Sequence, residues 1–233
     1  MMGLKEKFIL NFIEDSRWKY ITEGLGTTFI VTIFAIILGV ALGFLIAVVR
    51  STADKTEGHK GIVLRFLDLI CRVYLTVIRG TPAMIQLLIM YYIIFTSPNV
   101  SKRVVAILTF GFNSAAYVAE IIRSGIMSID NGQFEAGRSL GMNYVQTMIY
   151  IITPQAFRNI LPALANEFIT LLKETSICGY IALTDITHGA NVIRSQTYEP
   201  MLPLLGAALI YLTVVSVMSM GVTRLERRLR NDR

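Results

Sequence analysis

The chain has 233 residues, of which 54% are hydrophobic and only 16% are charged. Soluble globular chains carry about 25% charged residues, so this composition predicts an integral membrane protein and excludes a soluble one. The formal charge of +6 does not indicate nucleic-acid binding, because the basic residues cluster at the ends of apolar runs.

The sequence carries no catalytic or metal-binding motif. It contains no G-x-x-x-x-G-K-[ST] phosphate loop, so it is not an ATPase of that type, and it shows no nucleophile elbow, zinc motif or paired catalytic carboxylates. His59 and His188 are too few and too far apart for a metal site. Cys71 and Cys178 lie in or beside apolar segments and are expected to be buried, reduced thiols. We therefore expect no cofactor in this chain.

The N-terminal segment 1–20 predicts a helix that lies in the membrane interface. Its apolar residues Phe8, Ile9, Phe12 and Ile13 fall on one side, and Trp18 and Tyr20 follow as aromatic anchors. A cleaved signal peptide is not expected, because the charges are of both signs and the apolar run that follows is too long.

Five apolar runs predict an all-α, multi-pass membrane protein with one transmembrane domain over residues 1–233. A bilayer needs about 20 apolar residues in a helix, and the second run is short by that measure. Gly39 and Gly43 in the first run form a G-x-x-x-G pattern, which allows close approach of a helix from the same subunit or from a second one. The expected spans are 24–49, 82–95, 104–126, 162–183 and 201–223.

Residues 50–80 separate the first two spans and are rich in Lys and Arg. Arg65, Asp68 and Arg72 form one charged stripe on an otherwise apolar helix, which predicts a helix in the cytoplasmic interface. Thr81-Pro82 then resembles a helix cap with proline at the first helical position.

A polar stretch over 129–154 interrupts the apolar runs and predicts two short helices joined by a sharp corner. Asp130 or Asn131 can cap the first helix, and Gly141 can end it in the left-handed conformation. Asn143 can cap the second, with Gln146 as its capping-box partner, and Pro154 is expected to stop it. Such a pair, held outside the membrane, has a shape suited to docking into a groove on another protein.

Two later spans carry polar stripes that are candidates for a substrate pathway. Charged groups at membrane depth usually face a bundle interior or a wet cavity. Lys173 can take a carboxylate, and Glu167 or Glu174 can take an ammonium group. Two simpler roles stay open: Glu120 can pair with Arg123, and Lys173 and Glu174 can pair with other helices for packing. The stripes comprise Asn113, Tyr117, Glu120 and Ser124 in the third span and Asn166, Glu167, Thr170, Lys173 and Glu174 in the fourth.

The distribution of Lys and Arg predicts the orientation. If the stretch 129–154 lies in the cytoplasm, the inner segments hold twice as many Lys and Arg as the outer ones. Because cytoplasmic loops carry an excess of these residues, the N-terminus is expected outside and the C-terminus in the cytoplasm.

The stretch also resembles a known motif. Glu135-Ala136-Gly137, Gly141, Ile151 and Pro154 follow the spacing of the "EAA" loop, which marks the membrane-spanning subunits of ATP-driven, binding-protein-dependent importers. Gly137 replaces the second alanine of that motif, and Thr153 stands where a leucine is usual. Three further stretches extend the resemblance to the polar amino-acid permease subfamily, which includes the histidine, arginine and glutamine importers: GLGTT (24–28), RGTP (79–82) and AYVAEIIRSGI (116–126).

This resemblance implies a permease subunit of an ABC importer for amino acids, polar or charged, in the bacterial plasma membrane. It implies a second permease subunit, identical or homologous, two ABC ATPase subunits that bind ATP and Mg, and an extracytoplasmic solute-binding protein. Glu135, Ala136, Gly137 and Gly141 would then couple the permease to the ATPase. Two rivals are a secondary transporter driven by an ion gradient and a membrane enzyme acting on lipids. The enzyme would need a cluster of catalytic acids or metal ligands, which the sequence does not show.

Overall fold

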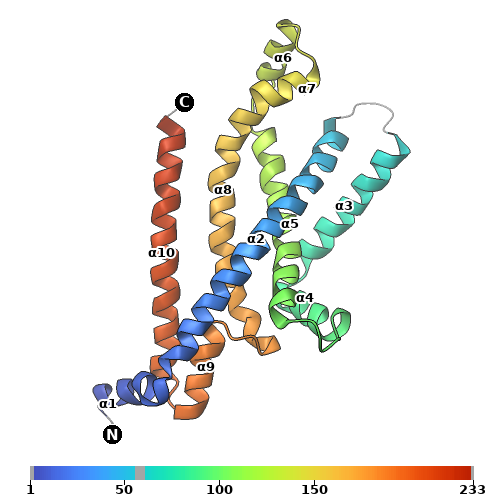
Figure 1. Ribbon diagram of the computed structural model, residues 1–233. Helices are drawn as coiled ribbons and strands as arrows, with labels where there is room; N and C mark the ends of the chain where they lie inside the picture. The colour runs from blue at the N-terminus through green and yellow to red at the C-terminus, as the bar shows by residue number, and fades with distance from the viewer. Residues whose placement is uncertain (1–2, 56–60, 232–233) are drawn as a thin grey trace. The chain divides into compact units, whose positions relative to one another are not determined.

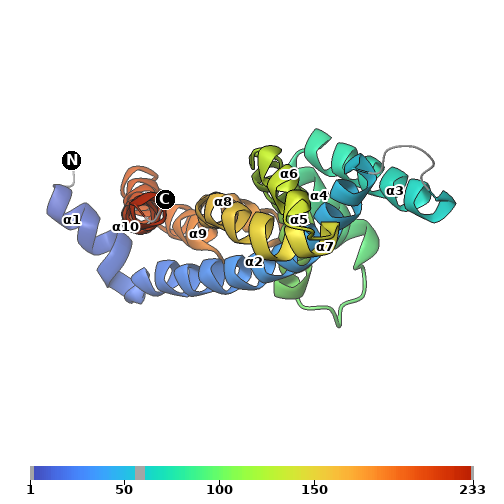
Figure 2. The same ribbon diagram turned by 90° about the horizontal axis from the view of Figure 1, so that it is seen from above.

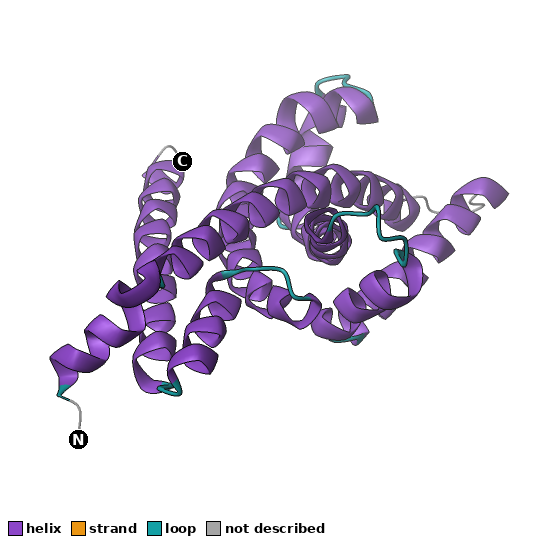
Figure 3. Cartoon of the chain, turned by 60° about the horizontal axis from the view of Figure 1, so that its bottom comes forward, coloured by secondary structure: helices purple, strands orange, loops and turns teal. Residues whose placement is uncertain are grey.

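The computed structural model describes residues 3–55 and 61–231, and the regular elements within those ranges are all helical (Figures 1 and 3). His59, one of the two histidines of the chain, lies outside the described residues. The all-α class is therefore confirmed.

The helices form two compact units. The first contains the residues up to Ile37, Thr81–Gly111 and Phe168–Met220. The second contains Leu38–Gly80, Phe112–Glu167 and the residues from Gly221 onward. The expected single domain is thus built from two groups of contacts, and four long helices contribute to both: α2 (Trp18–Lys55), α5 (Lys102–Met127), α8 (Thr153–Glu174) and α10 (Met201–Asn231).

The N-terminal segment is helical, as predicted, but it is divided. The helix α1 (Leu4–Phe8), a π turn η1 (Ile9–Ile13) and a short 3-10 turn η2 (Glu14–Ser16) precede α2. Asp15 and Ser16 have left-handed backbones, with φ of 50° and 54°, and this break turns the chain into α2. As Figures 1 and 2 show, α1 lies crosswise to α10.

The first unit has a core that draws on four helices. Val31 of α2, Leu87 of α4 (Ala83–Ile89), Phe110 of α5 and Leu171 of α8 are fully buried and pack in one cluster. The π turn η3 (Met90–Ile94) follows α4 directly, and Cys178 in the 3-10 segment η5 (Thr175–Ile181) closes the cluster. In a bilayer, where lipid is as apolar as these side chains, their close packing favours association of the helices.

The helix α9 (Ile186–Thr197), which the sequence did not predict, packs against the start of α2. A Cβ added at Gly24 would lie 2.4 Å from the backbone oxygen of Asp185, and one added at Gly189 would lie 2.5 Å from that of Tyr20. Only glycine permits such close contact between two backbones. The buried face of α9 is completed by Ile186, Ala190 and Ile193.

In the second unit, an ion pair between Arg50 and Asp68 joins α3 (Ile62–Gly80) to the second half of α2, and α5 packs on the same stretch of α2. Added Cβ atoms at Gly39 and Gly43 would lie 3.0 Å from Ser114 and 2.7 Å from Val118. Of the two partners considered for the G-x-x-x-G pattern, the structure shows a helix of the same subunit.

Three described helices are long and apolar enough to cross a membrane: Trp18–Asp54, Lys102–Met127 and Met201–Leu229. They contain the expected first, third and fifth spans. The second is a shorter apolar segment, Ala83–Ile94. The fourth was predicted to begin near Pro162, but Pro162 lies inside α8, which begins at Thr153 and ends at Glu174. The count of five spans stays a prediction.

Candidate functional site

The candidate docking element is the corner formed by α6 (Gly132–Ser139) and α7 (Tyr144–Thr147), which fold against each other beyond the end of α5 (Figure 1). Of the two expected caps of α6, Asp130 supplies the side-chain bond: its Oδ1 accepts from the Gly132 amide at 2.7 Å. Asn131 has a helical backbone and makes no capping bond with its side chain.

Gly141 ends α6 in the left-handed conformation, as predicted, with φ of 75°. The Met142 amide donates to the Gly137 carbonyl at 3.0 Å, and the Gly141 amide donates to that of Arg138 at 2.9 Å. These two bonds form a Schellman motif, which satisfies the last carbonyls of the helix and turns the chain.

The capping box at the start of α7 is also confirmed. The Gln146 amide donates to Asn143 Oδ1 at 2.9 Å, and the Asn143 amide donates to Gln146 Oε1 at 2.9 Å. The corner is therefore fixed at both helix ends by hydrogen bonds within a few residues of sequence.

Gly137 brings the two short helices into contact, a role that the sequence did not reveal. A Cβ at this position would lie 2.7 Å from both Cγ2 and Oγ1 of Thr147. The glycine that replaces the second alanine of the EAA motif is buried, whereas the other coupling candidates, Glu135, Ala136 and Gly141, are exposed.

The prediction that Pro154 stops the second helix is wrong. The chain stays helical from Tyr144 to Glu174, through a π turn η4 (Met148–Ile152) between α7 and α8. In this wider turn the Thr153 amide donates to the Met148 carbonyl, five residues back. Pro154 is only the second residue of α8, so the π turn accommodates a residue that has no amide hydrogen to donate.

The corner leaves apolar side chains uncovered. Leu140 is 77% exposed, and Tyr144, Val145, Ile149 and Tyr150 are also exposed. Exposed apolar patches of this kind typically mark an interaction surface.

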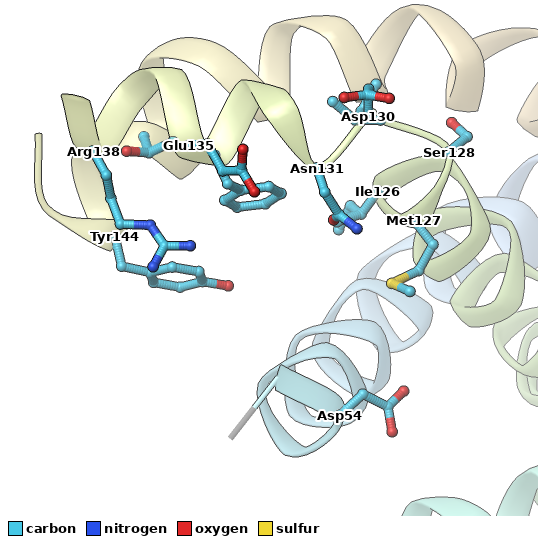
Figure 4. Close-up of a pocket in the computed structure, with 12 residues that line it drawn as sticks. Asp54, Ile126, Met127, Ser128, Asp130, Asn131, Glu135, Arg138 and Tyr144 are labelled. Atoms are coloured by element: carbon cyan, nitrogen blue, oxygen red, sulfur yellow. The ribbon is translucent and has the colours of Figure 1, made fainter. Parts of the chain in front are cut away.

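A cavity of about 920 Å³ lies between the corner and the ends of α2 and α5 (Figure 4). In that view Asp54, at the end of α2, lies on the opposite side of the cavity from Glu135 and Arg138 of α6, and its carboxylate points away from them. The rings of Phe134 and Tyr144 stack in its wall, with their centroids 6.2 Å apart.

Asp54 also belongs to a chain of ion pairs, here called the charge network, that connects α2, α3 and α5. Asp68 accepts from Arg50 Nη1 at 2.6 Å and from Arg72 Nε at 3.0 Å, and Asp68 is largely buried. The longer pairs Arg50–Asp54, Arg123–Asp54 and Arg79–Glu120 span 3.7–3.9 Å. With the 2.7 Å pair Arg123–Glu120, the network comprises Arg50, Asp54, Asp68, Arg72, Arg79, Glu120 and Arg123.

The polar stripe expected on α5 is divided in the structure. Asn113 is buried, and Tyr117 is 37% exposed. Glu120 is a member of the charge network, so the simpler role considered for it, pairing with Arg123, is the one that the structure shows. The Ser124 hydroxyl donates to a carbonyl of its own helix.

The polar residues of α8 are also divided between different sides of the helix. Asn166, Thr170 and Lys173 lie on an exposed face, and Glu174 is half-buried. Glu167 instead accepts a hydrogen bond from the Ser114 hydroxyl of α5 at 2.8 Å. Since Lys173 follows Glu167 by about one and two-thirds turns, the two side chains point to different sides of α8.

No group of three or more His, Cys, Asp or Glu residues suited to a metal ion occurs within residues 3–55 and 61–231. Long apolar helices, ionisable residues within them and an exposed, capped helix corner are together typical of a membrane-embedded transport subunit.

Comparisons with known proteins identify the family. The family model described as "Binding-protein-dependent transport system inner membrane component" matches residues 62–231. The chain therefore belongs to this family, whose members are the permease subunits of ABC importers and carry the EAA motif, while the ATPase is a separate chain.

Curated relatives match over almost their whole length. A putative glutamine transport system permease protein of Rickettsia typhi is 37% identical, over 96% of this chain and 98% of the relative. The arginine transport system permease protein of Bacillus subtilis is 35% identical, over 91% and 94% of the two chains. The L-cystine transport system permease protein of the same organism is 33% identical, over 94% and 90%.

Chains of solved structures also resemble this chain. A chain from the crystal structure of an amino acid ABC transporter with histidines matches with a TM-score of 0.81 and 39% identity, over 90% of this chain and 94% of that one. A chain of the MetNI methionine ABC transporter in an inward-facing conformation matches with a TM-score of 0.66 and 18% identity, over 98% and 99%, which shows a shared fold.

Proposed function

We propose that this chain is the permease subunit through which an ATP-driven importer moves amino acids into a bacterial cell. The observation that carries the proposal is the α6–α7 corner: a helix pair fixed by Asp130, Gly141 and Asn143, with exposed apolar side chains, on a chain whose relatives are amino-acid permeases. The partners are two ABC ATPase subunits that bind ATP and Mg, a second permease subunit, and an extracytoplasmic solute-binding protein.

The substrate pathway runs along the exposed polar face of α8. Asn166, Thr170 and Lys173 are uncovered within a long helix, where an exposed polar stripe is costly unless it faces water or a second subunit. Lys173 takes the substrate carboxylate. Glu167, on another side of the same helix, takes a cationic group. Asn113, Tyr117 and Glu174 are further candidates along the pathway. Glu120 is the least suited, because it is already paired with Arg123.

The corner lies in the cytoplasm and the N-terminus outside, in agreement with the distribution of Lys and Arg. Single cysteines test this orientation. A cysteine at position 133 should react with a membrane-impermeant reagent only after the cells are opened, and labelling of this position in intact cells would contradict the orientation.

The decisive experiment changes the corner in the complete, reconstituted transporter. Gly141→Pro removes the left-handed backbone that turns the chain, and Glu135→Arg reverses an exposed charge on α6. Both variants should fold but lose co-purification with the ATPase or lose substrate-stimulated ATP hydrolysis. The control is Glu226→Arg, the same charge reversal at an exposed position of α10. Normal co-purification and stimulation in both corner variants would refute the docking role.

A further inference from the structure

Ser114 lies where three helices of the second unit meet. It is fully buried on α5, and Gly39 of α2 approaches it so closely that an added Cβ would lie 3.0 Å from both its Cβ and its Oγ. On the other side, its hydroxyl donates to Oε1 of Glu167 on α8 at 2.8 Å. The close contact with α2 therefore fixes the position of this hydroxyl, and Glu167 on α8 accepts its hydrogen bond.

The bond made by Ser114 differs from those of the other serine and threonine hydroxyls on α5. Thr109 donates to the Val105 carbonyl at 2.8 Å, and Ser124 donates to the Ile121 carbonyl at 3.0 Å. Such bonds within one helix are the usual solution for a hydroxyl in an apolar segment. Ser114 gives its single proton to a carboxylate on a neighbouring helix instead.

Glu167 is half-buried, and within the described ranges no Lys, Arg or His side chain lies within ion-pair distance of it. The carboxylates of the charge network, Asp54, Asp68 and Glu120, each have at least one arginine partner. Because a neutral hydroxyl occupies one oxygen of Glu167 without cancelling its charge, the second oxygen can still bind a cation. A carboxylate held in this way is suited to a positive group that arrives and leaves.

We propose that Ser114 is a positioning residue that aims the Glu167 carboxylate at a cationic group of the substrate, and that Gly39 sets the position of Ser114. Every free amino acid carries a cationic group, because its α-amino group is protonated at neutral pH. The inference rests on the proposed function, since it assigns to Glu167 a ligand role in the transport pathway. It adds that the affinity for substrate depends on two residues that never touch the substrate.

The test measures uptake kinetics of the whole transporter in proteoliposomes, with radiolabelled arginine, histidine and glutamine as probes. Ser114→Ala should raise the KM of the transported amino acid about tenfold and leave the maximal rate within about twofold, because a hydrogen bond to a charged group is lost from binding and not from the ATP-driven step. Thr109→Val, which removes a buried hydroxyl bonded within its own helix at nearly constant volume, should leave KM unchanged.

The two glycines of the G-x-x-x-G pattern provide a matched pair. Gly39→Ala should raise KM, because the new methyl group displaces Ser114. Gly43→Ala introduces a tighter contact, 2.7 Å from Val118, and should lower thermal stability without changing KM. If the two variants changed KM equally, helix packing would explain the effect and the positioning role would be refuted.

A Glu167→Gln background separates the ligand role of Glu167 from the positioning role of Ser114. If Glu167→Gln transports with normal KM, the ligand role in the proposed function is wrong. If Glu167→Gln is impaired while Ser114→Ala has normal KM, only the positioning role is wrong. The expected result is that Glu167→Gln raises KM and that Ser114→Ala has no further effect in that background.

Discussion

The helix α9 and the helix pair α6–α7 are both short, but they differ in what covers them. The helix α9 buries four residues against its own unit: Ile186, Gly189, Ala190 and Ile193. At its C-terminal end, the Thr197 hydroxyl donates a hydrogen bond to Asn11 Oδ1. The α6–α7 pair buries only Gly137 and Thr147, in contact with each other, and exposes its large apolar side chains. One element is covered by its own chain, and the other presents an uncovered apolar surface.

The two elements are also stabilised by different kinds of interaction. Tertiary contacts hold α9, so substitutions at its contacts should lower the stability of the whole protein. Local hydrogen bonds at helix ends hold the α6–α7 corner, so substitutions there should disturb the corner and its docking with little effect on global unfolding. Three predictions follow from this contrast.

The largest effect is expected at Gly24, where α9 contacts α2. Gly24→Ala places a Cβ 2.4 Å from the Asp185 carbonyl oxygen, and backbone atoms cannot rotate away as a side chain can. We expect a loss of about 3 kcal/mol, at the upper end for overpacking, measured as a fall in melting temperature of the purified protein. Gly26→Ala is the control, since a Cβ there meets nothing within 4 Å and alanine favours the helix. Equal stability of the two variants would show that α9 is not held by this contact.

The second effect is a dependence of stability on pH, caused by the capping residue of α9. Asp185 accepts from the His188 amide at 2.9 Å and from the Thr187 amide at 3.3 Å. Burial raises the pKa of this carboxyl from its ordinary 3.8 to about 6, although the two amide bonds oppose the shift. The native state then holds the proton more tightly than the unfolded state, so stability is greatest below pH 3.8 and falls as the pH rises through 6.

The measurement compares Asp185→Asn with the unmodified protein between pH 4 and 7. An asparagine still caps the helix but has no proton to lose. Over this range the difference between the two unfolding free energies should change by about 2–3 kcal/mol in favour of the variant. The comparison cancels the contribution of groups that titrate alike in both proteins. Parallel pH profiles would contradict the assignment.

The smallest global effect is expected at Asn143 in the corner. Asn143→Ala removes the cap of α7, which costs about 1 kcal/mol locally. Because α7 buries so little, the melting temperature should barely change, whereas amide hydrogen exchange in 132–147 should become faster. Gln146→Ala keeps the Asn143 side-chain cap and loses only the reciprocal bond, so it should have a weaker effect. A fall in melting temperature comparable to that of Gly24→Ala would contradict the contrast between the two elements.

The same contrast explains what the sequence could predict. Gly141, Asn143 and Gln146 act on amides and carbonyls a few residues away, so their roles followed from spacing alone. The contact of Gly137 with Thr147 and those of Gly24 and Gly189 join segments that no local pattern relates, and neither they nor α9 was predicted. Pro154 misled the prediction because the usual rule assumes an α-helical turn before the proline, and this turn is wider.

For the charged residues, too, the sequence predicted only part of the structure. Periodicity identified stripes on α5 and α8, but it could not say which members would find partners. The sequence placed both Glu120 and Glu167 in candidate stripes and left open whether Glu120 pairs with Arg123. In the structure Glu120 lies among arginines, and Glu167 accepts from a serine. The tertiary arrangement of three helices made that distinction.

The π turn Met148–Ile152 has a consequence for helical phase. A π turn contains about one residue more than an α-helical turn, and one residue corresponds to about 100° of rotation about the helix axis. The extra residue therefore determines which way α6 and α7 point relative to the side chains in the first half of α8. Deleting one residue from this turn would rotate the corner by about a quarter turn, while every hydrogen bond that shapes the corner could still form. The π turn thus sets the direction of the corner separately from its shape.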